Sequence, residues 1–324
     1  MSLLKKLVTV AAGAALSIMA ATAAFAQDYP NRPIEVICGY VPGSGADIIV
    51  RFIATKLEEK AGQPVVVQNR VGAFGNVAVG AMVNSANDGY SLLLTGTSAV
   101  IGNLFVLKDA VYNPQVDLKP IATLLRNGFV LSVGPDSPAN SVEELIAIVQ
   151  EKGDEARYGQ SSVNSLAASE LFLTLTGLKA ERINYQSSTD MVPDLKANDL
   201  DFGMIDAVFA LNQQRQGNIK LLAGTPETHV PGSTDLPTME EAGVKGYQFA
   251  ANWASWFPKD TPEEITVKMH GWLTEIMSSE ETKEFLLKNG AEPLLSEYGG
   301  AAKLVADDLA KWERIAQAAK LEKQ

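Results

Sequence analysis

The stretch IEVICGYVPGSGAD, residues 34–47, decides the fold. Residues 34–40 are apolar and β-branched, which predicts a buried strand. Residues 46–61 follow with apolar side chains at helical spacing, such as Ile49 and Ile53. A loop with two glycines joins the two segments. A strand, a loop and a helix in this order predict the first unit of an α/β fold.

The alternation of strands and helices continues outward from that loop. The first block predicts further strands at residues 65–68 and 91–95, with a helix at 75–85 between them. In a second block we expect strands at 129–133, 157–159, 183–185, 200–205 and 219–223, and helices at 141–151, 166–176 and 191–197. Three helices follow at 263–278, 280–289 and 298–320. This rhythm predicts mostly parallel sheets flanked by helices.

The N-terminus carries the features of a secretory signal peptide. Lys5 and Lys6 precede an apolar stretch, and Ala24-Phe25-Ala26 provides small residues at the cleavage site. We therefore expect removal of residues 1–26 and a mature chain in the periplasm of a Gram-negative bacterium. The alternative is a membrane anchor, because about 20 apolar residues can span a bilayer. No charged stop-transfer cluster follows to support that alternative.

The length and charge of the mature chain limit its class. About 300 residues exceed one comfortable core, so we expect two domains. Without Lys5 and Lys6, the remaining 25 basic and 38 acidic residues give a net charge of −13. This charge argues against nucleic acid and anionic lipid as partners. A small anion can still be held locally by backbone amides and helix N-termini.

Residue types that carry catalysis or bind metals are sparse. The one cysteine, Cys38, lies in the apolar strand and has no disulfide partner. His229 and His270 are far apart in sequence and lack metal-type spacing. No phosphate-binding loop or nucleophile-elbow motif occurs. We therefore expect no metal, no cofactor and no enzymatic activity; a hydrolase or transferase is the weaker alternative.

Polar loops that follow predicted strands are the candidate ligand-binding site. The first block contributes Pro42, Gly43, Ser44, Gly45, Asp47, Thr95, Gly96, Thr97 and Ser98. The second block contributes Ser161, Ser162, Asn164, Ser165, Tyr185, Gln186 and Ser187. Ligands of open parallel sheets bind at the carboxyl ends of strands. We predict that the N–H groups of Gly43 and Gly45 hold a ligand carboxylate; the alternative is that each loop only caps its own helix.

Four aromatic side chains and one carboxylate complete the candidates. Tyr40, Phe74, Phe209 and Trp253 could line a cleft and stack on a flat ligand, although large aromatic residues are more often part of a core. Asp206 follows a predicted strand. There it could accept a hydrogen bond from a ligand or cap a helix.

Several motifs resemble the tripartite tricarboxylate transporter substrate-binding family, also called the Bug family. They are YPNRPI at residues 29–34, PGSGAD at 42–47, GQPVVVQNR at 62–70, GAFGN at 72–76, DGYSLL at 88–93, SVEEL at 141–145 and LPTMEEAG at 236–243. The resemblance covers essentially the whole mature chain. Its most specific part is the combination of the runs at 62–70 and 236–243.

The resemblance implies a two-domain, type II-like periplasmic-binding-protein fold that closes around a ligand in the cleft between the domains. Residues 27–127 and 250–324 would form a discontinuous first domain, and residues 128–249 the second. It also implies a small organic anion held by loop amides, hydroxyls and ordered waters, with membrane subunits of a secondary transporter as partners. We expect a monomer. A receptor that docks on a signalling partner is the alternative.

The chain departs from the family pattern in three loops. Gly43-Ser44-Gly45 stands where members often carry a glycine triplet. Val163-Asn164-Ser165 precedes Leu166 where members often have a histidine, and Tyr185-Gln186-Ser187 replaces a common Tyr-Lys-Gly run. The loss of two potential cations leaves two ligand classes open, a di- or tricarboxylate and an aromatic carboxylate.

Overall fold

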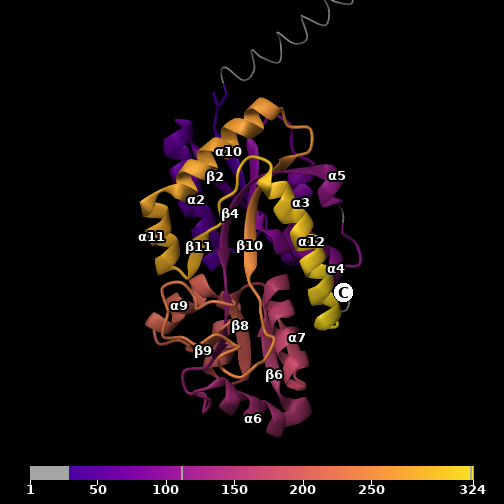
Figure 1. Cartoon of the computed structure of the whole chain (residues 1–324), viewed down its shortest axis with the longest axis vertical. Coiled ribbons are helices and arrows are strands. Elements are labelled where there is room, and N and C mark those ends of the chain that lie inside the picture. The colour runs from indigo at the N-terminus through magenta and orange to yellow at the C-terminus, as the bar shows by residue number, and fades with distance from the viewer. Residues whose placement is uncertain (1–28, 111, 322, 324) are drawn as a thin grey trace, which may run out of the picture.

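The computed structural model describes residues 29–110, 112–321 and 323. These residues form two lobes, each built around one sheet (Figure 1). The predicted signal peptide at residues 1–26 lies outside the described residues. Within the described part of the chain, every helix is too short or too polar to span a membrane.

The first lobe contains a six-stranded sheet in the order β11-β4-β10-β3-β1-β2. Its strands are β1 (Ile34–Cys38), β2 (Val65–Asn69), β3 (Ser91–Gly96), β4 (Leu118–Asn127), β10 (Ala251–Pro258) and β11 (Ala291–Pro293). β1 is parallel to β2 and β3, while β10 lies antiparallel between β3 and β4. β1 to β4 therefore share one direction, and β10 and β11 run against them, so the α/β prediction is confirmed with a mixed sheet.

Helices cover both faces of the first sheet. They are α2 (Gly45–Ala61), α3 (Asn76–Val83), α10 (Glu263–Ser278), α11 (Glu280–Lys288) and α12 (Gly300–Ala318), with short turns η1 (Ala73–Gly75), η2 (Ser98–Gly102), α4 (Asn103–Val106) and α5 (Pro114–Asp117). Successive side chains of a strand point to opposite faces. Val36 accordingly packs in the core that holds α2 and α10, and Ile37 packs in the core that holds α3 and α12.

The second lobe contains a five-stranded sheet in the order β7-β6-β8-β5-β9. Its strands are β5 (Phe129–Val133), β6 (Arg157–Gln160), β7 (Glu181–Asn184), β8 (Phe202–Asp206) and β9 (Lys220–Gly224). Its helices are α6 (Val142–Lys152), η3 (Gly153–Glu155), α7 (Val163–Thr176), α8 (Ser188–Lys196) and α9 (Ala207–Arg215). Only β5 runs against the other four strands, because it is antiparallel to both β8 and β9.

The chain crosses between the sheets twice, and one buried threonine joins the crossings. Gly128 links β4 to β5, and Ala250 leads back into β10. The Thr225 hydroxyl accepts a hydrogen bond from Phe129 N at 2.8 Å and donates to Phe249 O at 2.8 Å. The backbone of Thr225 also bonds to both residues at 2.9 Å. The two crossing segments are therefore tied together at one point.

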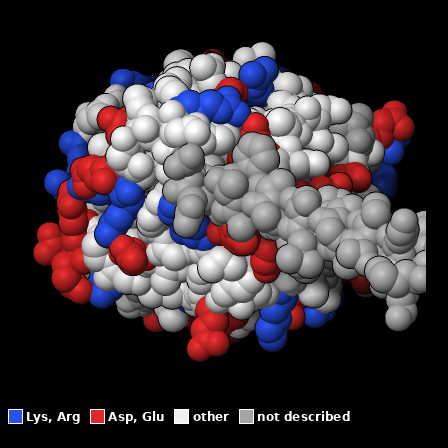
Figure 2. All heavy atoms as spheres, turned by 90° about the horizontal axis from the view of Figure 1, so that it is seen from above, with Lys and Arg blue, Asp and Glu red and all other residues white. Residues whose placement is uncertain are grey.

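Charged side chains are mixed over the end of the first lobe that Figure 2 views. Lys and Arg lie interspersed with Asp and Glu on this face. The excess of acidic residues is therefore not gathered into one patch there.

Candidate functional site

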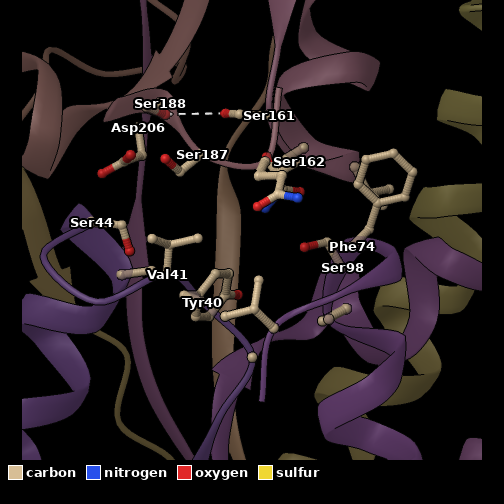
Figure 3. Close-up of a pocket in the computed structure, with 18 of the residues that line it drawn as sticks. Tyr40, Val41, Ser44, Phe74, Ser98, Ser161, Ser162, Ser187, Ser188 and Asp206 are labelled. Atoms are coloured by element: carbon tan, nitrogen blue, oxygen red, sulfur yellow. Dashed lines mark hydrogen bonds between the residues drawn. The ribbon is translucent and has the colours of Figure 1, made fainter. Parts of the chain in front are cut away.

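A cavity of about 480 Å³ lies between the two lobes. Its wall is formed mainly by loops that follow β1, β2, β3, β6, β7 and β8, at the carboxyl ends of these strands. Figure 3 shows Tyr40, Val41 and Ser44 on one side of the cavity and Ser161, Ser162, Ser187, Ser188 and Asp206 on the other. We call this space the inter-lobe cavity.

Four helices direct their N-termini at the inter-lobe cavity. The N-cap residues are Ser44 of α2, Ser162 of α7, Ser187 of α8 and Asp206 of α9, and all four line the cavity. Each N-cap side chain accepts a hydrogen bond from the third amide of its helix. The first amides of a helix have no intrahelical partner and carry partial positive charge. Four such ends from two lobes form a site suited to an anion.

The side chains of the cavity add almost no formal charge. Among the described residues that line it there is no Lys, Arg or His, and Asp206 is the one carboxylate. Burial raises the pKa of Asp206 to about 6, although the hydrogen bond from Phe209 N opposes this shift. An anion in the cavity must therefore be held by N–H and O–H groups rather than by cationic side chains.

Aromatic rings form an apolar floor whose polar atoms are already paired. Tyr40 packs on Trp253 with ring centroids 5.5 Å apart. The Tyr40 hydroxyl accepts hydrogen bonds from Thr95 Oγ1 and Gly96 N, both at 3.1 Å, and Trp253 Nε1 donates to Asn127 Oδ1 at 3.0 Å. Burial raises the pKa of Tyr40 to about 12, so its hydroxyl stays protonated at neutral pH. The rings thus offer apolar surface to a ligand.

A strained turn places Phe74 at one end of the cavity (Figure 3). Four consecutive residues, 72–75, have positive φ, and Phe74 itself has φ 55°. Non-glycine residues rarely adopt this conformation. Asn103 Nδ2 donates a hydrogen bond to Phe74 O at 3.2 Å, which stabilises the turn.

Twelve of the predicted site residues line the cavity. They are Tyr40, Ser44, Phe74, Ser98, Ser161, Ser162, Asn164, Tyr185, Gln186, Ser187, Asp206 and Trp253. Pro42, Gly43, Gly45, Asp47, Thr95, Gly96, Thr97, Ser165 and the aromatic candidate Phe209 do not line it.

Most of the remaining polar candidates have partners inside the protein. Asp47 accepts hydrogen bonds from Gly43 N, Arg51 and Asn69. Thr97 donates to Asp308, and Ser165 donates to Met204 O at 2.8 Å. These side chains hold the loops in shape beneath the cavity wall.

The prediction that the Gly43 N–H holds a ligand carboxylate needs correction, and Gly45 has a packing role that the prediction did not include. The Gly43 N–H donates to Asp47 Oδ2 at 2.9 Å, so it is not available to a ligand. Gly45 lies where the two lobes touch: a Cβ there would collide with the Asp206 carboxylate and approach Phe209 N to 2.9 Å. Gly45 is therefore needed for the close approach of α2 and α9. Ala46, the next residue of α2, does line the cavity.

Several lining residues escaped prediction. Asn127 and Phe129 flank the first crossing, Asn184 ends β7, and Ser188 bonds Ser161 through their hydroxyl oxygens at 3.1 Å. The candidate loop after β7 extends over residues 185–189 and contains Ser188, although only Tyr185, Gln186 and Ser187 were predicted as ligand contacts; Asn184 lies directly before it. Apolar residues such as Val41 and Ile49 carry no sequence signal that separates them from core residues.

The cysteine and both histidines lie elsewhere. Cys38 is buried, which raises the pKa of its thiol to about 12. His229 pairs with Glu241 at 2.9 Å, and His270 contacts Ser296 O at 3.3 Å. In the described part of the chain no group of three or more His, Cys, Asp or Glu side chains could hold a metal ion.

Comparison with known proteins agrees with this geometry. Residues 49–321 match the family described as "Tripartite tricarboxylate transporter family receptor". BugT of Bordetella pertussis is 31% identical over 313 residues, which cover 93% of this chain and 95% of BugT. Among solved structures, "R. palustris Rpa4515 with adipate" has a TM-score of 0.89 at 28% identity, covering 92% of this chain and all of that one. The periplasmic binding protein BugD has a TM-score of 0.85 at 26% identity, with 91% and 100% coverage.

The match in sequence extends over most of the chain, and the match in structure extends over both lobes. The chain therefore belongs to the tripartite tricarboxylate transporter receptor family of periplasmic solute-binding proteins.

Proposed function

We propose that this protein captures a small organic carboxylate in the inter-lobe cavity and delivers it to the membrane subunits of a tripartite tricarboxylate-type transporter. The observation that carries the proposal is the convergence of four helix N-termini on a cavity whose described lining residues include no cationic side chain. Membership of a receptor family and the likeness to a structure named with adipate support it. The receptor acts in the periplasm as a monomer, after removal of residues 1–26.

The cavity favours a ligand with few charges and an apolar body. A carboxylate can accept hydrogen bonds from the first-turn amides and from the hydroxyls of Ser44 and Ser162. Each further carboxylate would lie near Asp206 without a cation to balance it. The rings of Tyr40, Phe74 and Trp253 supply apolar surface for the remainder of the ligand. Linear dicarboxylates and aromatic carboxylates are therefore the two classes we propose, ahead of tricarboxylates.

Capture would involve movement of the lobes about the two crossings. Residues 27–127 with 250–324 would move as one body and residues 128–249 as the other, with Gly128 and Ala250 near the hinge. Side chains on both sides of the cavity then contact one ligand, as in hinge closure of other binding proteins. Closure shields the bound carboxylate from water, which strengthens its hydrogen bonds.

A thermal-shift panel tests this function. The mature protein is heated with adipate, benzoate, citrate, glucose and lysine in turn, because a ligand that binds only the folded state raises the melting temperature by mass action. We expect adipate or benzoate to give the largest shift, and citrate a smaller one. Stabilisation by glucose or lysine alone would contradict the proposal.

A further inference from the structure

A second cavity, of about 440 Å³, lies against the crossing strands. Both lobes contribute to its wall. Arg126 of β4 and Asn252 of β10 meet the loop 226–228, which follows β9, and α12 supplies Lys311 and Arg314. We call this space the hinge pocket.

The hinge pocket and the inter-lobe cavity lie on opposite faces of β4 and β10. Arg126 and Asn252 are paired in the register of these strands, and both line the hinge pocket. The next residue of each strand, Asn127 and Trp253, lines the inter-lobe cavity. Successive strand side chains point to opposite faces, so neighbouring residues of the same two strands line the two spaces from opposite sides.

The hinge pocket concentrates positive charge in an acidic protein. Among the described residues of its wall, Arg126, Lys311 and Arg314 face one acidic residue, Glu227, while the whole chain has a net charge of −11. Arg126 is already paired with Glu292 at 2.6 Å. Among the described residues, neither Lys311 nor Arg314 has a carboxylate within ion-pair distance, although Lys311 donates a hydrogen bond to Ala250 O.

The surroundings of Lys311 indicate that the hinge pocket could accommodate a negatively charged group. Burial lowers the pKa of Lys311, and its ammonium lies 5.9 Å from the centre of the Phe249 ring. The charge of Asp308, three residues earlier on α12, opposes this shift, but both oxygens of Asp308 already accept hydrogen bonds from Thr97 and Asn252. A partly buried cation with one hydrogen bond to a carbonyl is stabilised further when a negative group completes its shell. A small oxyanion would accept the remaining ammonium protons and could also accept from the Arg314 guanidinium.

We propose that the hinge pocket is a second anion-binding site, which takes a small oxyanion of the phosphate type, and that its occupancy alters the affinity of the inter-lobe cavity. The anion would contact α12, a crossing strand and the loop 226–228 at once. That loop begins next to Thr225, which ties both crossings together. An anion that binds one inter-lobe angle more tightly than another shifts the equilibrium toward the angle that it prefers. Binding in the hinge pocket and binding in the inter-lobe cavity then change each other's affinity by the same factor.

Phosphate titration of the mature protein by calorimetry tests the site. Arg314 is exposed, so Arg314→Gln leaves the fold intact, and Lys311→Gln is the second variant. We expect each to weaken phosphate binding about tenfold or more, as for loss of a charged hydrogen bond. Lys303→Gln is the matched control, because Lys303 lies on the same helix but pairs with Asp307 at the surface. It should bind phosphate like the wild type.

Two further measurements separate this site from the inter-lobe cavity. Ser162→Gly, which alters the inter-lobe cavity, should leave phosphate affinity unchanged. The affinity for a carboxylate ligand, measured with and without saturating phosphate at constant ionic strength, should change in the wild type and stay constant in Arg314→Gln. Only this coupling rests on the proposed function. The phosphate site would be overturned if phosphate did not bind, if Arg314→Gln and Lys303→Gln bound it equally well, or if Ser162→Gly lost phosphate binding. The coupling would be overturned if saturating phosphate left the carboxylate affinity of the wild type unchanged.

Discussion

At the scale of single residues, Ser44 and Ser162 show how one hydroxyl can serve both a helix and a ligand. The Oγ atoms accept hydrogen bonds from Asp47 N at 3.3 Å and Ser165 N at 3.1 Å. These bonds use the oxygen and leave the hydroxyl proton available to the cavity. Ser187 differs, because its hydroxyl donates to Asp190 Oδ2 at 2.9 Å. Capping and ligand binding are therefore compatible at Ser44 and Ser162.

Replacing Ser162 by Gly tests this dual role. Glycine is a tolerable N-cap, so the free energy of unfolding should fall by only a few tenths of a kcal/mol. Loss of a hydrogen bond to a carboxylate should cost about 1.5–3 kcal/mol of binding, or roughly 10- to 150-fold in Kd. Ser141→Gly is the matched control, because Ser141 caps α6 in the same way but does not line the cavity. Urea unfolding and calorimetry on both variants should show similar stability and a loss of affinity in Ser162→Gly alone. Equal affinities would refute a contact between Ser162 and the ligand.

Asp206 should make binding depend on pH. Its pKa is raised to about 6, so the side chain is negative at pH 8 and largely neutral at pH 5. The affinity for a carboxylate that stays ionised over this range should therefore rise as the pH falls from 8 to 5. The same shift means that the contribution of Asp206 to stability is full below about pH 4 and is lost as the pH rises through 6.

Asp206→Asn isolates this effect, because asparagine caps a helix as well as aspartate does. The variant should bind the anion more tightly than the wild type at pH 8, with a flat profile between pH 5 and 8. Calorimetry at four pH values measures both curves. If the affinities of the wild type and Asp206→Asn changed with pH in the same way, the charge of Asp206 would have no effect on ligand binding.

At the scale of elements, the sequence predicts most helices and strands within each lobe. It misses the two strands that connect the lobes, β4 and β10, and also α9 and the short strand β11, which each lie within one lobe. The bounds predicted for β5 and α10 match the structure, because β5 is a short, mostly apolar run and α10 has apolar residues at helical spacing. β4 and β10 were missed: β4 contains Lys119, Pro120 and Arg126, and neither strand alternates between polar and apolar residues. Both strands are buried along most of their length, where packing rather than alternation decides the structure.

The sequence predicts which loops form the candidate site, but it does not predict which side chain or N–H group of each loop faces the cavity. Polar residues after strands identified the correct edges of both sheets. Which group in a loop faces the cavity depends on partners elsewhere in the chain. Gly43 was misjudged because its N–H is taken by Asp47, and Thr97 because it bonds Asp308, which is distant in sequence.

The contact between α2 and α9 gives a prediction at this scale. Gly45→Ala places a Cβ within 2.9 Å of Phe209 N and against the Asp206 carboxylate, so the two helix ends must move apart. We expect weaker ligand binding and a larger radius of gyration in the presence of ligand, measured by small-angle scattering. Gly271→Ala, in the middle of α10 with open space around its Cα, is the control and should match the wild type. A wild-type radius in Gly45→Ala would show that this contact does not set the inter-lobe distance.

At the scale of the whole molecule, the proposed function requires an acidic protein to bind an anion by local arrangement rather than by net charge. The inter-lobe cavity relies on helix N-termini and hydroxyls, and the described residues that line it include no cationic side chain. Helix N-termini act over short distances, so the negative charge elsewhere has little influence on a closed, dry site. The same crossing strands carry the basic hinge pocket on their other face. The two lobes therefore enclose two cavities that differ in charge: the inter-lobe cavity and the basic hinge pocket.

In the proposed function, backbone amides and hydroxyls between the lobes hold a carboxylate. This binding mode is tested most directly by comparing the affinity of the mature protein for the best carboxylate ligand with its affinity for the matching primary amide. The amide has nearly the same shape but no charge to accept hydrogen bonds from helix N-termini. Calorimetry should show the amide binding at least about 100-fold more weakly, with only a modest effect of added salt on the acid. Equal affinities for acid and amide would contradict the account.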